Sequence, residues 1–147
     1  MPIDISNDSI DISSENQTEE LANRFSKKLN KGDVIFFYGE MGVGKTTFIK
    51  YLINKLQQEN KIATTEITSP TFNLLNEYQI NKMNIFHYDL FRLKSTKELK
   101  NLDLFSDRFS GITLIEWPQI IKEKPKNLIE LIFEYDENYK KRFVKIK

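Results

Sequence analysis

The stretch that decides the fold is Val34-Ile35-Phe36-Phe37-Tyr38-Gly39-Glu40-Met41-Gly42-Val43-Gly44-Lys45-Thr46. Its first five residues are continuously apolar and rich in β-formers, which predicts a strand that is covered on both faces. The next eight residues match the pattern Gly-x-x-x-x-Gly-Lys-Thr without a gap. Residues 46–58 then carry apolar side chains at helical spacing, which predicts a helix. Strand, glycine loop and helix therefore follow one another in the order that this motif requires.

The glycine loop predicts a phosphate-binding site. Glycines let successive backbone N–H groups curl around an anion, because no Cβ atom stands in the way. The positive end of the helix that begins near Thr46 adds to that attraction. Lys45 can reach the outer phosphate oxygens of a nucleotide, and the hydroxyl of Thr46 is placed to ligate magnesium. A tight turn would be the plain alternative, but three of the chain's five glycines fall within this loop. We therefore expect the cofactors to be ATP and Mg²⁺.

Composition excludes several other classes of protein. The 22 basic and 21 acidic residues leave a net charge of +1, unlike a protein that coats nucleic acid. The absence of cysteine excludes disulfide frameworks and cysteine-based metal sites. There is no apolar run of about 18 residues that could span a membrane, and the polar, acidic residues 1–9 do not resemble a signal peptide. We expect a cytoplasmic protein with no membrane partner, built as a single ATPase domain over residues 1–147.

The rest of the chain alternates strands and helices. Ile3, Ile5, Ile10 and Ile12 alternate with polar residues, which predicts an early edge strand. Ser14 and Gln17 have the spacing of a capping box, and the following helix would present Leu21, Phe25 and Leu29 on one stripe. Further strands are predicted at residues 74–80, 84–88 and 112–115, a short helix at 96–102, and a closing hairpin at 128–135 and 143–146. This pattern predicts a three-layer α/β, P-loop NTPase-like domain with a mixed, mainly parallel central sheet.

Two carboxylates end predicted strands. Asp89 follows residues 84–88, and Glu116 follows residues 112–115. If both strands run parallel to residues 34–38, both carboxylates reach the edge of the sheet that carries the glycine loop. Two assignments fit: Glu116 serves the metal while Asp89 orients or deprotonates the attacking water, or the two exchange roles. For His87, the only histidine, packing or hydrogen bonding is favoured over catalysis.

Several motifs together resemble one known family. They are Gly39-Glu-Met-Gly-Val-Gly-Lys-Thr-Thr-Phe48, Ser69-Pro-Thr-Phe72, Asn76-Glu-Tyr78, His87-Tyr-Asp-Leu-Phe-Arg-Leu93 and Ile115-Glu-Trp-Pro118. Their order and spacing over almost the whole chain resemble the TsaE (YjeE) family, bacterial ATPases needed for the threonylcarbamoyl modification of adenosine 37 in certain tRNAs.

The resemblance implies specific roles for residues. Lys45 would bind phosphate, Glu116 would correspond to the Walker B carboxylate, and Asp89 to an acid implicated in hydrolysis. These three are the expected catalytic residues, and Thr46 and Glu116 the expected metal ligands. The residues expected to bind the nucleotide are Glu40, Met41, Gly42, Val43, Gly44, Lys45, Thr46, Thr47 and Trp117. Residues 69–72 resemble the family's switch-like segment near the γ-phosphate.

The resemblance also implies partners, namely the proteins TsaD and TsaB, whose complex such an ATPase would act on. A small-molecule kinase with the same loop is the alternative enzyme, but it usually needs an arginine-bearing lid, and the chain offers few arginines there. A nucleotide-sensing scaffold without turnover is a third reading. The basic run Lys140, Lys141, Arg142, Lys145 and Lys147 is typical of a solvated face, with transient contact to tRNA as the alternative.

Overall fold

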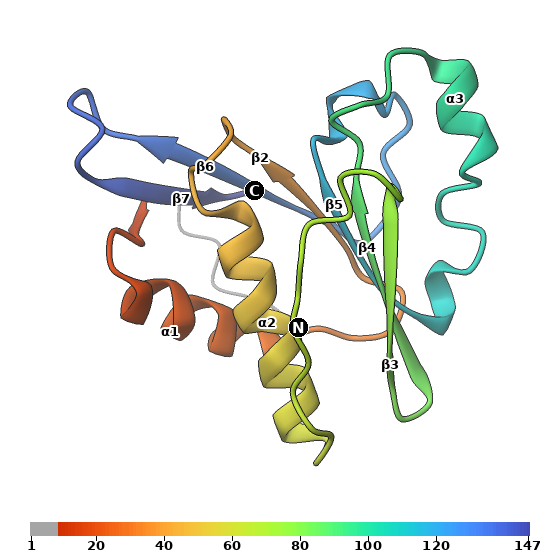
Figure 1. The fold of residues 1–147 in the computed structure, drawn as a ribbon, viewed down its shortest axis with the longest axis horizontal. Helices are drawn as coiled ribbons and strands as arrows, with labels where there is room; N and C mark the ends of the chain where they lie inside the picture. The colour runs from red at the N-terminus through yellow and green to blue at the C-terminus, as the bar shows by residue number, and fades with distance from the viewer. Residues whose placement is uncertain (1–8) are drawn as a thin grey trace.

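A computed structural model describes residues 9–147, which form one seven-stranded sheet with helices packed against it (Figure 1). The strands are β1 (Ile10–Asp11), β2 (Val34–Tyr38), β3 (Leu75–Ile80), β4 (Met83–Asp89), β5 (Gly111–Glu116), β6 (Leu128–Tyr135) and β7 (Arg142–Ile146). The α-helices are α1 (Glu15–Ser26), α2 (Lys45–Glu59) and α3 (Thr96–Asn101), and short 3₁₀ turns lie at Arg108–Ser110 and Pro118–Ile120. Ile3 and Ile5, which contributed to the predicted edge strand, lie outside the described residues.

The order of strands across the sheet is β1-β7-β6-β2-β5-β4-β3. The four middle strands, β6, β2, β5 and β4, run parallel to one another. The outer strands pair antiparallel: β3 with β4 at one side, and β7 with β6 and β1 at the other. The predicted mixed sheet with a parallel centre, the closing hairpin and the early edge strand at Ile10 are therefore confirmed.

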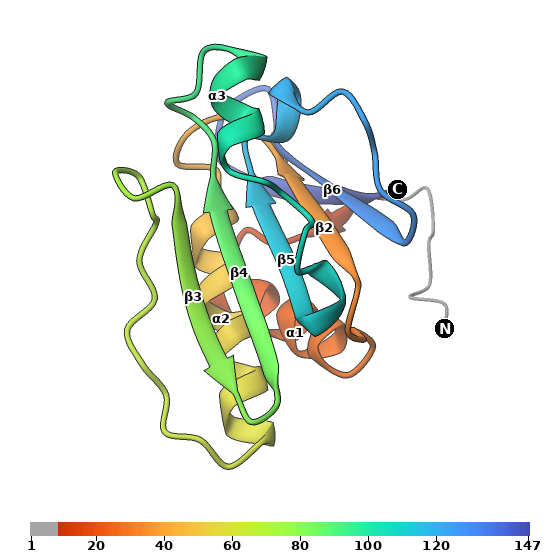
Figure 2. The ribbon, with the colours of Figure 1, turned by 90° about the vertical axis from the view of Figure 1, so that its right-hand side faces the viewer.

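Each face of the sheet is covered, which gives the predicted three layers. Helices α1 and α2 pack on one face of the sheet. The segment that contains α3 lies on the opposite face (Figure 2). Side chains alternate between the faces along a strand, so Ile35 and Phe37 of β2 join the core under α1 and α2, while Val34 and Phe36 join the opposite core. Among the described helices, none combines the length and apolar character needed to cross a membrane.

Helix α1 begins with the predicted capping box. The amide of Gln17 donates to Ser14 Oγ at 3.2 Å, and the amide of Ser14 donates to Gln17 Oε1 at 3.0 Å, so two otherwise unpaired donors are satisfied. The helix ends at Ser26, and Leu29 therefore packs against the core from the following turn and not from the predicted helical stripe. The amides of Lys28 and Leu29 both donate to Phe25 O, which closes the helix in a tight turn.

Phe48 anchors helix α2, and thereby the glycine loop, to the sheet. Its ring lies 5.6 Å from Phe25, 5.8 Å from Phe37 and 6.0 Å from Phe133 between ring centroids, and it is fully buried. Such aromatic contacts add to the stabilisation that burial alone provides.

We expect Phe48→Ala to lower the free energy of unfolding by about 3–5 kcal/mol, because it leaves a cavity at the centre of this cluster. Denaturant titration followed by circular dichroism would measure the change. Phe72→Ala is the matched control: its ring is 83% exposed, and we expect a change within about 0.5 kcal/mol. Equal effects of the two substitutions would contradict the placement of Phe48.

Candidate functional site

The glycine loop joins the end of β2 to the start of α2 and depends on glycine at two positions. Gly44 caps α2 in a left-handed conformation with φ of +114°, which a side chain would strain. Gly39 has φ of +146°, and a Cβ there would lie 2.8 Å from the carbonyl oxygen of Phe133. The loop therefore packs closely against β6 and directs the positive end of α2 toward the space above the strand ends.

Lys45, the first residue of α2, folds back over the loop. Its ammonium group donates to Gly39 O and lies 3.6 Å from the centroid of the Trp117 ring. Burial lowers the pKa of Lys45, while the negative charges of Glu116 and Asp89 oppose that shift. The charge is thus held in a largely dehydrated position next to the glycine loop, where an anion would gain most from it.

Asp89 and Glu116 lie side by side at the ends of β4 and β5. The two residues are register partners in a parallel pair, so their side chains point to the same face of the sheet. This face is the one that α2 covers. Both are buried, with 6% and 2% of their surface exposed. The parallel orientation that the sequence argument assumed is confirmed.

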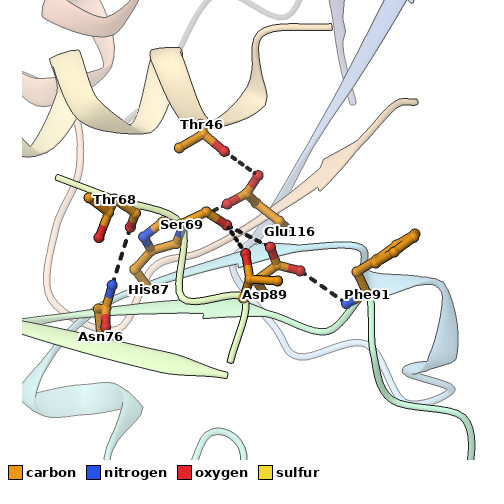
Figure 3. A network of polar contacts seen from close by, with 9 residues as sticks. Thr46, Thr68, Ser69, Asn76, His87, Asp89, Phe91 and Glu116 are labelled. Atoms are coloured by element: carbon orange, nitrogen blue, oxygen red, sulfur yellow. Dashed lines mark hydrogen bonds and ion pairs between the residues drawn. The ribbon is translucent and has the colours of Figure 1, made fainter. Parts of the chain in front are cut away.

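The carboxylate of Glu116 is held by two side chains. The hydroxyl of Thr46 donates to Glu116 Oε1 at 2.9 Å, and His87 Nε2 lies 2.8 Å from Oε2 (Figure 3). Because an ionised carboxylate only accepts hydrogen bonds, Nε2 is the donor in this contact when Glu116 is ionised. His87 is fully buried, and its Nδ1 has no hydrogen-bond partner among residues 9–147. A hydrogen-bonding role for His87, as favoured from the sequence, is confirmed.

Asp89 is held by the segment that precedes β3 and by the chain that follows β4. Ser69 Oγ donates to Asp89 Oδ2 at 2.7 Å, and the amide of Phe91 donates to Oδ1 at 3.0 Å (Figure 3). The segment itself is fixed by Asn76, whose side-chain amide donates to Thr68 O at 3.2 Å. Both carboxylate oxygens of Asp89 are thus already oriented by hydrogen bonds.

Lys45, Thr46, Ser69, Asp89 and Glu116 line one pocket of about 310 Å³. Its lining residues are Met41, Gly42, Gly44, Lys45, Thr46, Thr47, Ser69, Thr71, Asp89, Phe91, Glu116, Trp117 and Arg142. Nine of them are site residues that the sequence predicts. Glu40 and Val43 are also predicted from the sequence but are not part of the lining: the side chain of Glu40 is exposed, and that of Val43 is buried in the core.

Trp117 forms one wall of the pocket. It adopts a left-handed backbone conformation with φ of +58° directly after β5, and its ring contacts Phe91 at 4.8 Å between centroids. Its amide donates to Phe37 O at 3.3 Å, which ties this turn to the end of β2. The indole therefore lies between the Lys45 ammonium group and the chain that follows β4.

Besides Phe91, which the sequence offered only as part of a motif, Arg142 and Tyr135 reach the pocket without having been predicted as site residues. Arg142 lines it from β7, although its position in a basic run suggested a solvated face. Tyr135 donates through its hydroxyl to Gly42 O at 2.9 Å and supports the loop from β6. No local motif marks either residue, because both reach the loop only through the order of strands in the sheet. Arg92 contacts the switch-like segment at Thr71 O and Phe72 and is not part of the lining.

Known proteins resemble this chain over most of its length. A family model described as threonylcarbamoyl adenosine biosynthesis protein TsaE matches residues 12–144. A relative from Rickettsia conorii, named tRNA threonylcarbamoyladenosine biosynthesis protein TsaE, is 39% identical over 132 residues, which cover 88% of this chain and 73% of the relative. A protein of the same name from Aquifex aeolicus is 35% identical over 130 residues, which cover 88% of this chain and 90% of the relative.

A solved structure shares the fold. The crystal structure of YdiB from Bacillus subtilis aligns with a TM-score of 0.64 at 23% identity, covering 89% of this chain and 78% of that one. The family model matches nearly the full length of the chain, and the two relatives are each more than a third identical to it. The chain belongs to the TsaE family.

Proposed function

We propose that the protein is a magnesium-dependent ATPase of tRNA N6-threonylcarbamoyladenosine biosynthesis and that it acts on a complex of TsaD and TsaB. The observation that carries the proposal is the convergence of Lys45, Thr46, Asp89 and Glu116 on one pocket at the start of α2. Its relatives are named for that biosynthesis, and the chain acts in this proposal as one ATPase domain. A part in tRNA modification agrees with a cytoplasmic location.

The pocket suits the phosphates of ATP. The positive end of α2, the glycine loop and the Lys45 ammonium group all face the same space. Lys45 donates to Gly39 O, and phosphate oxygens would offer it a charged acceptor in place of that carbonyl. In this proposal residues 40–47 bind the phosphates through the backbone N–H groups of the glycine loop, and Trp117 flanks them.

The pair formed by Thr46 and Glu116 suits magnesium. A hydroxyl and a carboxylate oxygen at 2.9 Å are hard oxygen donors of the kind that Mg²⁺ prefers, and it fills its other positions with water and phosphate oxygens. When bound, the ion would neutralise charge on the phosphates during transfer. His87 fixes the second oxygen of Glu116, so the carboxylate is presented in one orientation.

Asp89 is then the residue that orients or deprotonates the attacking water. Its link to Ser69 supports this assignment, because residues 69–72 resemble a switch-like segment of the family that would lie near the γ-phosphate. Glu116 is linked instead to Thr46, the expected metal ligand. The two strand-end acids thus contact different neighbours, which supports different roles.

Exposed apolar side chains beside the pocket support a protein partner. Met41, Phe72 and Phe91 are 67%, 83% and 51% exposed, and two of them line the pocket. Large exposed apolar side chains gathered around a site are typical of a surface that another protein covers. In this proposal TsaD and TsaB are that partner, and any contact with tRNA is indirect or transient.

ATP hydrolysis with and without a purified TsaD–TsaB complex tests the proposal. We expect slow turnover by the protein alone and clear stimulation by the complex. A lack of stimulation, combined with phosphate transfer to a small acceptor, would favour the kinase alternative. Nucleotide binding with no hydrolysis under either condition would favour a nucleotide-sensing scaffold.

Removal of the Lys45 ammonium group should weaken nucleotide binding. We expect Lys45→Ala to raise the Kd for ATP at least about tenfold, because the charge-assisted hydrogen bonds to phosphate are lost. Isothermal titration calorimetry measures this directly. Lys50→Ala is the control, since Lys50 lies on the same helix and is exposed. The assignment of Lys45 fails if both variants bind ATP as the unsubstituted protein does.

The two acids should be separable by their magnesium dependence. We expect Glu116→Gln to raise the Mg²⁺ concentration needed for half-maximal hydrolysis about tenfold, because a charged ligand becomes a neutral amide. Asp89→Asn should lower the maximal rate about a hundredfold or more and leave the Mg²⁺ requirement unchanged. Magnesium titrations of stimulated hydrolysis distinguish the two variants. The reverse pattern would exchange the roles of Asp89 and Glu116.

A further inference from the structure

Arg142 differs from the other residues of the C-terminal basic run. Lys140, Lys141 and Lys147 are exposed, and Lys145 forms an ion pair with Glu134 at 3.5 Å. Arg142 is partly buried at the start of β7 and lines the pocket. One residue of the run thus faces the glycine loop, while its neighbours face solvent or another strand.

The guanidinium of Arg142 is held in place from one side. Its Nη2 donates to Ser13 O at 3.1 Å, and the backbone amide of Arg142 donates to Ser13 Oγ at 2.9 Å. Its Nη1 reaches the glycine loop, where it would lie 3.5 Å from a Cβ built on Gly44. Nη2 is therefore anchored, while Nη1 is directed toward the start of α2. Because the side chain is already held in place, Arg142 loses less conformational entropy when it binds an anion.

The positive charge of Arg142 has no carboxylate partner within residues 9–147. Among the side chains that the structure describes, the contacts between a basic group and a carboxylate join His87 to Glu116, Lys124 to Glu130 and Lys145 to Glu134. A half-buried guanidinium that lines a pocket gains most from a ligand that offers two acceptor oxygens, as a phosphate does.

The order of strands places Arg142 away from the two acids. In the order of strands, β7 lies two positions from β2 in one direction. Strands β5 and β4, which carry Glu116 and Asp89, come after β2 in the opposite direction. The glycine loop follows β2 and lies between them. Arg142 and the two acids therefore approach the loop from opposite sides.

We propose that Arg142 binds the phosphates at the nucleoside end of the nucleotide, those that ADP retains, and not the γ-phosphate. This inference rests on the proposed function, in which Asp89 and Glu116 act at the γ-phosphate and its magnesium ion. Arg142 is thus a binding residue that holds ATP and ADP alike, and it leaves the reacting end of ATP to the acids across the pocket.

Binding of ATP and ADP to Arg142 variants tests the inference. We expect Arg142→Ala to raise the Kd of both nucleotides by a similar factor of about ten, because charge-assisted hydrogen bonds to a phosphate are lost. Arg142→Lys should recover part of the affinity by keeping the charge, and Arg142→Gln should recover none. Lys141→Ala, which removes an exposed neighbouring charge, should bind as the unsubstituted protein does. Calorimetry gives the Kd values, and thermal unfolding checks that each variant is folded.

Other outcomes overturn the inference in distinct ways. A loss confined to ATP would place Arg142 at the γ-phosphate, and full affinity in Arg142→Gln would indicate a contact with a neutral group. Unchanged binding in Arg142→Ala would remove Arg142 from the site but leave the proposed function intact. If the unsubstituted protein binds neither nucleotide, the proposed function fails and the inference fails with it.

Discussion

The parallel pairing of β4, β5 and β2 is the constraint on which the site depends. It brings the carboxyl ends of three strands to one edge of the sheet, so that Asp89, Glu116 and the glycine loop meet there. Gly111 permits this pairing at the start of β5, because a Cβ there would lie 1.7 Å from the carbonyl oxygen of Asn84 on β4. The register that this close approach fixes also sets Asp89 opposite Glu116. Two buried carboxylates thus point to the face where α2 begins.

The pocket is connected to the surface through the segment between α2 and β3. Gln57 of α2 exchanges hydrogen bonds with Thr65, Asn76 of β3 holds Thr68, and Ser69 donates to Asp89. Beyond these contacts the chain carries the exposed Phe72, whose ring lies 5.3 Å from the Arg92 guanidinium. A single short segment therefore links a carboxylate of the pocket to an exposed aromatic side chain. Such a link is the kind of structure through which changes at the pocket and at the surface can influence each other.

The charges around the pocket are divided between its two sides. Lys45 lies near the middle, next to the loop and Trp117. Asp89 and Glu116 approach from β4 and β5, and Arg142 approaches from β7. A nucleotide needs positive charge along its row of phosphates. It needs carboxylates only at the place where its metal ion binds. The sheet order provides such a division, since it separates the acids from the arginine by the width of the loop and its flanking strands.

The sequence by itself determined the strand, glycine loop and helix, the two strand-end acids and the capping box of α1, because each rests on contacts between residues close in the chain. The family motifs added Trp117 and the segment at residues 69–72 in the same way, as short runs with fixed spacing. Only the tertiary structure decided that Glu116 contacts Thr46 and His87, that Asp89 contacts Ser69, and that Arg142 belongs to the pocket. These contacts join residues on different strands and helices, and they depend on the order and register of the sheet. Arg142 in particular lies almost a hundred positions from the glycine loop, and a basic run gives no sign of which member turns inward.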